Sequence, residues 1–352
     1  MRIGSREISD SASPYVIAEI GVNHDGSAER AIELVDAAAA AGADAVKFQY
    51  FEAERLMGGA APLADYQRNA GESNATEMLK RLELSLGDLE SIVDHAHDQR
   101  LHAIVTIFNV ELVVDATRLG WDAFKSASPD IIHLPLLEAI SAPGRPVILS
   151  TGAATRDEIG WALSRFGSAA LHCISAYPTP DDEANLGGIA ALRSLAQETR
   201  RSIEVGYSDH TPSLDTGALA VAAGAVILEK HLTHDRHAPG PDHAASLEPD
   251  ALRVYIEGAR RAHRMLGVRE LTVRPIEEDV RRVSRQSIVA SRDLPAGHCL
   301  TRSDLTFRRP GDGIPPSEWG AIVGRSLQAP IPAGKPIRRE DLTTPAKVRE
   351  FA

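Results

Sequence analysis

The sequence predicts a TIM barrel, an α/β fold of eight parallel (β/α) units, followed by a small β-rich domain. Three observations carry this prediction. From residue 15 to about residue 266, short β-branched apolar runs alternate with helical patterns, which is typical of βα units around a parallel sheet. Eight such runs fall within about 250 residues, which fits a TIM barrel in count and length. A repeated motif follows beyond residue 285, in a segment too short for a second barrel.

The predicted strands and helices follow one another in a regular order. The eight strands are YVIAEIG from Tyr15, AVKFQ from Ala45, AIVTIF from Ala103, AFKSAS from Ala123, PVILST from Pro146, ALHCIS from Ala170, EVGYSDH from Glu204 and AVILEKHL from Ala225. Ser27 is the predicted N-cap of a helix that ends at Gly42. Thr155 and the glutamate three residues later form a capping box for another helix. A doubly wound open sheet is the alternative fold, but no GxGxxG motif follows the first strand, so the barrel ranks first.

The chain of 352 residues is longer than a single core usually supports, so we expect a second domain. Residues 1–273 are predicted to form the barrel, and the charged residues 274–285 a linker or exposed helix. Residues 286–346 form the small domain and 347–352 a tail. In the small domain LPAGHCLTRSDL from Leu294 recurs as IPAGKPIRREDL from Ile331, which predicts a pseudo-symmetric unit of short strands that docks on another surface.

The composition excludes several classes of protein. Hydrophobic residues make up 43% and charged residues 25%, a balance that excludes disorder and a disulfide scaffold. With 38 basic and 49 acidic residues the net charge is −11, which disfavours a nucleic-acid-binding surface. The sequence has no apolar run of signal-peptide or membrane-spanning length. Cys173 and Cys299 form no CxxC pair. We therefore expect a cytoplasmic protein that binds neither nucleic acid nor a membrane.

The active site of a TIM barrel lies at the C-terminal ends of its strands, so polar residues there are candidates. Such residues are dense in this sequence. They are Glu19, Asn23, His24, Lys47, Gln49, Thr106, Lys125, Ser128, Ser150, Gly152, Ser175, Tyr177, Ser208, Asp209, His210, Glu229, Lys230 and His231. An unpaired charge in a barrel core is costly, so packing alone does not explain them.

His210 and His231 end adjacent strands and are candidates to share one metal ion such as Mn²⁺, Zn²⁺ or Fe²⁺. The alternative is two hydrogen-bonded core histidines. Lys47 and Lys125 are candidates to neutralise a phosphate or carboxylate, and the alternative is buried salt bridges to carboxylates such as Glu19. A Schiff-base aldolase is disfavoured because the sixth strand contains no lysine. The segment 239–246 is either a substrate loop or a helix-capping turn.

Taken together, several motifs resemble the sialic acid synthase family. They are IAEIGVNHDG, AVKFQ, LLEAISAPGRPVILSTGAAT, LHCISAYPTP, GYSDHT and LEKHLTHDRHAPGPDHAASLEP, the last two being the most specific. The segment SIVASRDLPAGHCLTRSDLTFRRPGDGI resembles the antifreeze-like (SAF) domain of that family. The resemblance thus covers nearly the whole chain in the family's order.

The resemblance implies a phosphoenolpyruvate-dependent condensation with an N-acylated amino sugar, which yields a nine-carbon 2-keto-3-deoxy acid and phosphate. The candidate sugars are N-acetylmannosamine and a 2,4-diacetamido-trideoxyhexose. It also implies a divalent metal ion, Mn²⁺ in the first place with Mg²⁺ or Co²⁺ as alternatives. A domain-swapped homodimer is implied as well, in which the small domain closes the barrel of the partner subunit.

The family's functional residues match single positions of this chain. His210 and His231 match the metal ligands, and Glu19 matches an active-site carboxylate that moves protons or orients water. Arg309 matches an arginine that reaches the partner's site. The predicted substrate contacts are Gln49, Thr106, Ser128, Asp130, Ser150, Gly152, Ser175, Tyr177 and Asp242, together with the phosphoenolpyruvate ligands Lys47 and Lys125.

The sequence also departs from the family pattern. Ala127 and Pro129 flank Ser128 where the family often has a glycine after that serine, which bears on the sugar pocket, and TIFN replaces the commoner TPF at Thr106. GPDH from Gly240 resembles neuraminate and legionaminate synthases more than pseudaminate synthases. The alternatives left open are a pseudaminate-type synthase, a synthase acting on a sugar phosphate, and a sugar-binding homologue without turnover.

Overall fold

The computed structural model describes residues 1–58, 62–69, 71–268 and 270–343. Contacts within the chain define two units, Met1–Gly267 and Val268–Ala352, and each is described by itself. The predicted bounds 1–273, 274–285 and 286–346 stay a prediction. Residues 344–346 of the predicted small domain and the predicted tail 347–352 lie outside the described residues.

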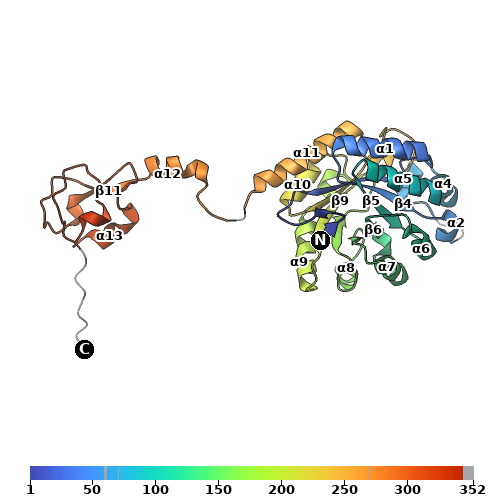
Figure 1. The fold of residues 1–352 in the computed structure, drawn as a ribbon, viewed down its shortest axis with the longest axis horizontal. Coiled ribbons are helices and arrows are strands. Elements are labelled where there is room, and N and C mark those ends of the chain that lie inside the picture. The colour runs from blue at the N-terminus through green and yellow to red at the C-terminus, as the bar shows by residue number, and fades with distance from the viewer. Residues whose placement is uncertain (59–61, 70, 269, 344–352) are drawn as a thin grey trace, which may run out of the picture. The chain divides into compact units, whose positions relative to one another are not determined.

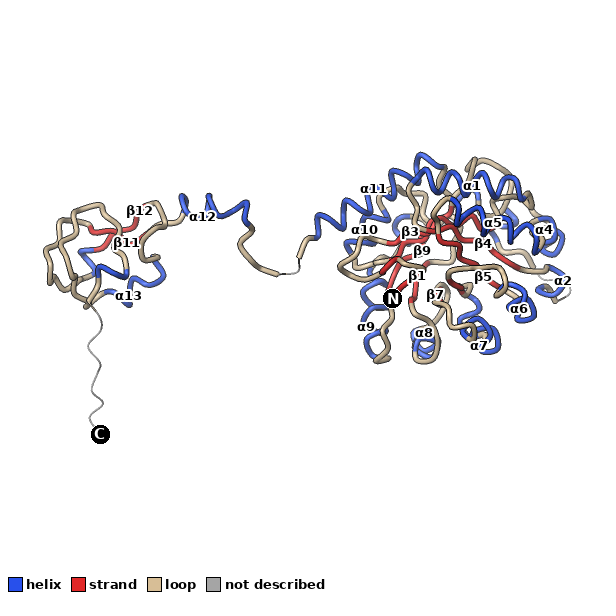
Figure 2. The backbone as a smooth tube through the Cα atoms, viewed as in Figure 1, coloured by secondary structure: helices blue, strands red, loops and turns tan. Residues whose placement is uncertain are grey.

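The first unit is a closed barrel of parallel strands, which confirms the predicted TIM barrel (Figures 1 and 2). The strands are β3 (Tyr15–Gly21), β4 (Ala45–Tyr50), β5 (His102–Ile107), β6 (Ala123–Lys125), β7 (Val147–Ser150), β8 (Ala169–Cys173), β9 (Glu204–Asp209) and β10 (Ile227–His231). Strand β10 pairs in parallel with β9 and with β3. This closure excludes the doubly wound open sheet.

Helices surround the barrel (Figure 2). They are α1 (Ala28–Ala41), α2 (Ala53–Leu56), α3 (Asp65–Asn69), α4 (Ala75–Arg81), α5 (Leu86–Asp98), α6 (Val113–Ala116), α7 (Leu134–Ser141), α8 (Arg156–Leu163), α9 (Gly187–Glu198), α10 (Thr216–Ala222) and α11 (Pro249–Leu266). The longer ones, such as α1, α5, α9 and α11, bury their apolar sides against the strands of the barrel. Ser27 caps α1, which ends at Gly42 with φ 86°, and Thr155 with Glu158 caps α8, as predicted. Within the described ranges, no helix is long and apolar enough to cross a bilayer.

A short hairpin that sequence reasoning left unassigned covers the N-terminal end of the barrel. Strands β1 (Arg2–Ile3) and β2 (Arg6–Glu7) pair antiparallel. Ile3 and Ile8 are buried in a cluster with apolar residues from the beginnings of the barrel strands, including Tyr15 and Ile17. The hairpin therefore closes the end of the barrel opposite to the one that carries the candidate residues.

The second unit contains a small apolar core of its own. Strand β11 (Ser287–Ala290) pairs antiparallel with β12 (Leu305–Arg308), and the helices are α12 (Glu278–Ser284) and α13 (Trp319–Ile322). The two copies of the repeat pair with each other, since the backbones of Leu294 and Ile331 exchange two hydrogen bonds of 2.9 Å. The predicted pseudo-symmetry is therefore present in the backbone pairing.

Candidate active site

A pocket of about 370 Å³ lies at the C-terminal ends of the barrel strands. Twelve of the predicted site residues line it: Glu19, Lys47, Gln49, Thr106, Lys125, Ser128, Ser150, Ser175, Tyr177, His210, His231 and Asp242. Since they come from all eight strands or from the segments that follow them, barrel closure brings most of them together.

Each of the two lysines is paired with a buried carboxylate. Lys47 Nζ lies 2.7 Å from Glu19 Oε2 and donates a hydrogen bond of 3.0 Å to Thr106 Oγ1. Gln49 Nε2 donates to the other oxygen of Glu19 at 3.0 Å. Lys125 Nζ lies 3.4 Å from Glu229 Oε1. The salt-bridge alternative is thus present, yet both ammonium groups also line the pocket, where they are available to an anion.

The two carboxylates differ in how they ionise. Burial raises the pKa of Glu19 despite the opposing charge of Lys47, and Glu229 adds to the rise. Burial acts in the same direction on Glu229, but Lys125 and Lys47 outweigh it and lower its pKa. Glu229 is therefore the fixed negative charge of the pair. Glu19, whose carboxylate form is disfavoured by burial, is the group better suited to exchange a proton.

The two histidines face each other, with ring centroids 5.4 Å apart. His210 Nδ1 lies 2.7 Å from the carbonyl oxygen of Ile174, so this nitrogen carries the hydrogen and Nε2 keeps its lone pair. Burial lowers the pKa of His210 to about 4, and burial with the nearby His210 lowers that of His231 well below its ordinary value. Both rings are neutral imidazoles at pH 7, which is the form that binds metal ions.

One nitrogen of this histidine pair makes no hydrogen bond within the described part of the chain. His231 Nδ1 is buried and has no hydrogen-bond partner among the described residues, although Asp242 Oδ2 lies 3.6 Å away. The Tyr177 ring lies against the pair, 4.2 Å from the centroid of His210. In the part of the chain that is described, no group of three or more His, Cys, Asp or Glu side chains could hold a metal ion. The protein itself thus offers two imidazoles.

A cluster of hydroxyl groups lies beside Lys125. Ser128 Oγ and Ser150 Oγ are 2.9 Å apart, and Cys173 Sγ lies 3.3 Å from Ser128 Oγ. Gly152 packs directly behind this cluster, because a Cβ there would lie 2.2 Å from Ser175 Oγ. These serines present hydroxyl donors on the same side of the pocket as a cation, an arrangement that suits a phosphate or carboxylate.

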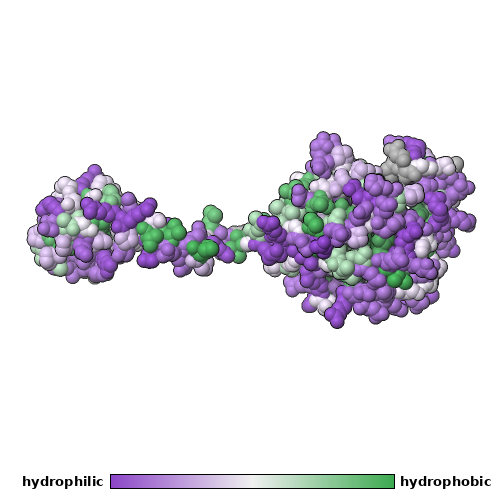
Figure 3. All heavy atoms as spheres, turned by 90° about the horizontal axis from the view of Figure 1, so that it is seen from above, coloured by the Kyte–Doolittle hydropathy of each residue, from purple (hydrophilic) through white to green (hydrophobic). Residues whose placement is uncertain are grey.

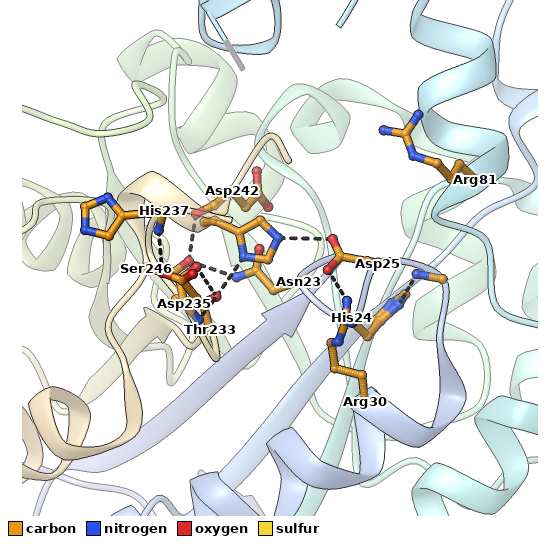
Figure 4. A network of polar contacts seen from close by, with 12 residues as sticks. Asn23, His24, Asp25, Arg30, Arg81, Thr233, Asp235, His237, Asp242 and Ser246 are labelled. Atoms are coloured by element: carbon orange, nitrogen blue, oxygen red, sulfur yellow. Dashed lines mark hydrogen bonds and ion pairs between the residues drawn. The ribbon is translucent and has the colours of Figure 1, made fainter. Parts of the chain in front are cut away.

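Asp242 enters the pocket from the segment that follows β10. We call residues 233–247 the Asp242 loop; part of it is drawn in Figure 4. Burial raises the pKa of Asp242 to about 7, and the negative charge of Glu19 contributes. The predicted substrate loop 239–246 therefore does contribute to the pocket, through Pro241 and Asp242.

Three predicted residues do not line the pocket. Asp130 lies in the 3₁₀ turn Ser128–Ile132, where burial raises its pKa to about 6. Gly152 packs against the side chains of Ser128 and Ser175 and is not among the lining residues. Arg309 is an exposed residue of the second unit. Their predicted substrate contacts stay predictions.

Two groups of pocket residues were not among the predicted substrate contacts or catalytic residues. Ser208 and Glu229 were candidates from their place at the strand ends, but no role was predicted for them; Ser208 Oγ donates a hydrogen bond of 2.9 Å to Glu229 Oε1, and each lies two positions before a histidine, on the same face of its strand. The second group is a set of large apolar side chains, which we call the apolar wall. It consists of Val22, Phe51, Leu56, Met78, Leu79, Leu82 and Phe108, all from segments that follow β3, β4 and β5.

The fold and the pocket define a barrel enzyme whose site combines paired lysines, a histidine pair and hydroxyl donors. The same chain also carries a small second domain. Residues 34–270 match the NeuB family, and residues 285–343 match the SAF domain. The chain belongs to the NeuB family, which confirms the resemblance to sialic acid synthases.

Individual relatives cover nearly the whole chain. It is 36% identical over 351 residues to N,N'-diacetyllegionaminic acid synthase of Legionella pneumophila, covering 96% of this chain and 97% of that protein. It is 35% identical over 320 residues to N,N'-diacetyllegionaminic acid synthase of Campylobacter jejuni, covering 88% and 94%. The crystal structure of N-acetylneuraminic acid (sialic acid) synthetase from Leptospira borgpetersenii, in complex with citrate, has a TM-score of 0.71 at 31% identity, covering 80% and 94%.

Proposed function

We propose that this protein condenses phosphoenolpyruvate with an N-acylated amino sugar and water, giving a nine-carbon 2-keto-3-deoxy acid and phosphate. The observation that carries the proposal is a pocket lined by two ammonium groups, several serine hydroxyls and the apolar wall. Membership of the NeuB family supports the same reaction. In this reaction C3 of phosphoenolpyruvate bonds to the aldehyde carbon, water adds at C2, and phosphate leaves by cleavage of its bond to C2.

The anionic substrate is assigned to the side of the pocket with the lysines. Lys47 and Lys125 neutralise the phosphate and carboxylate, and Ser128, Ser150 and Ser175 donate hydrogen bonds. Charge-assisted hydrogen bonds are about twice as strong as neutral ones, so this set orients phosphoenolpyruvate as well as binding it. Glu19 is assigned the proton transfers, because its raised pKa makes it the more readily protonated of the two buried carboxylates.

A divalent ion is proposed at His210 and His231. The donor set fits such an ion, since both rings are neutral and His231 Nδ1 has no hydrogen-bond partner among the described residues. When bound, an ion such as Mn²⁺, Mg²⁺ or Co²⁺ supplies Lewis-acid polarisation of a carbonyl oxygen. The protein's own part is to hold the two imidazoles in place, through the hydrogen bond from His210 to Ile174 and the packing of Tyr177.

The apolar wall favours one of the two candidate sugars. A 2,4-diacetamido-trideoxyhexose carries methyl groups on both acetamides and at C6, whereas N-acetylmannosamine carries hydroxyl groups at C4 and C6. Hydroxyl groups buried against Phe51, Met78 and Leu79 lose hydrogen bonds to water. We therefore infer that the trideoxy sugar is the substrate, which agrees with the product named for the two relatives.

The experiment is phosphate release from phosphoenolpyruvate across a panel of N-acylated sugars. We expect kcat/KM for the trideoxy sugar to exceed that for N-acetylmannosamine by about tenfold or more. Leu79→Gln should narrow this ratio, whereas Leu134→Gln, at a 41% exposed residue outside the pocket, should leave it unchanged. A preference for N-acetylmannosamine would refute the choice of sugar but not the reaction. No release with any sugar would favour the homologue without turnover.

A homodimer with a shared site is also proposed. Eight of the fifteen large hydrophobic side chains found exposed lie between Met265 and Val283, a segment whose apolar surface is visible in Figure 3. Apolar side chains in this number are typical of a segment that packs against another surface, and in a homodimer that surface is supplied by the partner subunit. The resemblance assigns Arg309 to the partner's site, where a guanidinium can bind an acyl carbonyl.

Subunit exchange tests the shared site. Arg309→Ala chains mixed with inactive Lys125→Ala chains should regain activity, because one site of each heterodimer then combines an intact Lys125 with an intact Arg309. Arg309→Ala alone should raise KM for the sugar more than KM for phosphoenolpyruvate. Exchanged heterodimers without recovered activity would show that Arg309 does not act across subunits.

A further inference from the structure

The Asp242 loop is closed at its base by backbone hydrogen bonds. Thr233 N donates to Leu247 O at 3.0 Å, and Leu247 N donates to His231 O at 2.9 Å. Both ends of the loop thus lie at the end of β10, next to the histidine pair. The position of the Asp242 carboxylate depends on how the rest of the loop is held.

Asn23, just beyond β3, joins the two ends of the loop to the barrel. Its Nδ2 donates to Leu232 O and to Ser246 Oγ, each at 2.8 Å. Figure 4 shows Asn23 beside Ser246. Ser246 Oγ in turn donates to the backbone carbonyl of Asp242 at 2.7 Å. Asn23 and Ser246 are both almost fully buried, so water does not compete for these hydrogen bonds. A single amide therefore fixes the backbone of Asp242 relative to β3.

His243 holds the middle of the loop from its outer side. Its Nε2 lies 3.0 Å from Asp25 Oδ1, and its Nδ1 lies 2.7 Å from Thr233 Oγ1. Since a carboxylate only accepts hydrogen bonds, Nε2 carries the hydrogen and donates to Asp25. Asp25 also binds Arg30, the third residue of α1 (Figure 4). The ring is 1% exposed, so it forms a buried link between the Asp242 loop and the segment after β3.

Gly240 leaves the space that this link needs. A Cβ at Gly240 would lie 2.7 Å from His243 Cδ2 and 3.0 Å from its Nε2. Any side chain at Gly240 would therefore displace the His243 ring from Asp25. The glycine of the GPDH motif thus leaves room for the ring of His243.

We propose that Asn23 and the Asp25–His243 pair are positioning residues that fix the Asp242 loop, so that the Asp242 carboxylate faces the sugar in the pocket. The inference rests on the proposed function, because the family resemblance matches Asp242 to a contact of the amino sugar. None of the positioning residues is among those that line the pocket, so their effect passes through the loop.

The experiment compares four variants of the full-length protein. Asp25→Ala removes the acceptor for His243, and Asp25→Asn restores an oxygen at that place. Arg30→Ala is the matched control, because it removes the ion pair of Asp25 but keeps the hydrogen bond from His243. Gly240→Ala keeps every hydrogen-bonding group but places a Cβ against the His243 ring, at a backbone φ of 153° that alanine rarely adopts. For each variant we measure KM for the sugar, KM for phosphoenolpyruvate, bound Mn²⁺, and hydrogen exchange of the backbone amides of residues 234–246.

Asp25→Ala and Gly240→Ala should raise KM for the sugar by about tenfold, the size expected for a lost hydrogen bond to a charged group. They should accelerate exchange in residues 234–246 and leave KM for phosphoenolpyruvate and bound Mn²⁺ unchanged. In Asp25→Asn, KM for the sugar should lie within about threefold of the wild-type value. In Arg30→Ala, KM for the sugar should equal the wild-type value.

Two results would overturn the inference. Loop exchange that is the same in Asp25→Ala and the wild type would show that the pair does not hold the loop, whatever the activity. Faster loop exchange with an unchanged KM for the sugar would show a structural role only. If the wild type released no phosphate with any sugar, the proposed function would fail, and the exchange rates would still decide whether the pair fixes the loop.

Discussion

Gly152→Ala should weaken phosphoenolpyruvate binding by displacing serine side chains that are assigned to this substrate. The backbone of Gly152 does not require a glycine through a positive φ, so the substitution acts only through space. The added Cβ would lie 2.2 Å from Ser175 Oγ, 2.6 Å from Cys173 Sγ and 2.8 Å from Ser128 Oγ. All three distances are well below van der Waals contact. Each of these side chains must therefore move.

The size of the effect follows from these contacts. Moving Ser128 breaks its 2.9 Å hydrogen bond with Ser150, and both serines are assigned to the anionic substrate. A lost hydrogen bond to a charged group costs about 1.5–3 kcal/mol, so KM for phosphoenolpyruvate should rise by about ten- to hundredfold. The overpacked site should also lose about 1–3 kcal/mol of folding stability.

The assay is initial-rate phosphate release with varied phosphoenolpyruvate at saturating sugar, together with denaturant unfolding. Gly258→Ala is the matched control, since a Cβ there in α11 meets nothing within 4 Å. It should leave both KM values unchanged and add about 0.5–1 kcal/mol of stability, because alanine favours a helix. A wild-type KM for phosphoenolpyruvate in Gly152→Ala would refute the assignment of the serine cluster to that substrate.

Three further predictions concern the small domain, the histidine pair and the reaction class. In the small domain, burial alone would raise the pKa of Asp304, but hydrogen bonds from His298, Thr301 and Arg292 outweigh it and lower the pKa. Asp304→Ala should therefore destabilise this domain by about 1.5–3 kcal/mol at pH 7, the range for lost hydrogen bonds to a charged group. The ionised carboxylate stabilises the fold above its unfolded pKa of about 3.9, so the difference from the wild type should shrink as pH falls below about 4, as checked by hydrogen exchange in residues 287–343. His231→Ala should lower bound Mn²⁺ and phosphate release together, measured by metal analysis after dialysis, and unchanged metal content would exclude His231 as a ligand. Borohydride added with both substrates should leave the intact mass unchanged, whereas a covalent adduct on a lysine would favour the aldolase.

Much of the barrel was predictable from the sequence because local patterns and global fold agree. Apolar runs alternate with capped helices, and the caps at Ser27 and Thr155 act locally, so a short segment is enough to identify them. The hairpin Arg2–Glu7 was not predicted. Its strands contain two residues each, and only the apolar layer at the beginnings of the barrel strands explains why Ile3 and Ile8 are buried.

The polar half of the site was predictable for a similar reason. The C-terminal ends of parallel strands meet in a barrel, so residues such as Lys47 and His231 had to be close together. The apolar wall was not predictable in this way, because Met78 and Leu79 lie on α4, far along the sequence from any strand end. The same holds for the link between Asp25 and His243, which are 218 residues apart, since only the closure of β10 on β3 brings them together.

The closed N-terminal end of the barrel determines how substrates enter the pocket and how products leave it. Because the hairpin and its apolar layer block that end, the pocket is blind, and molecules enter and leave through the same mouth. Two substrates that share such a pocket must be present together before the bond between them can form. Double-reciprocal plots of initial rate for the two substrates should therefore intersect. The order in which substrates bind and products leave determines which product competes with which substrate.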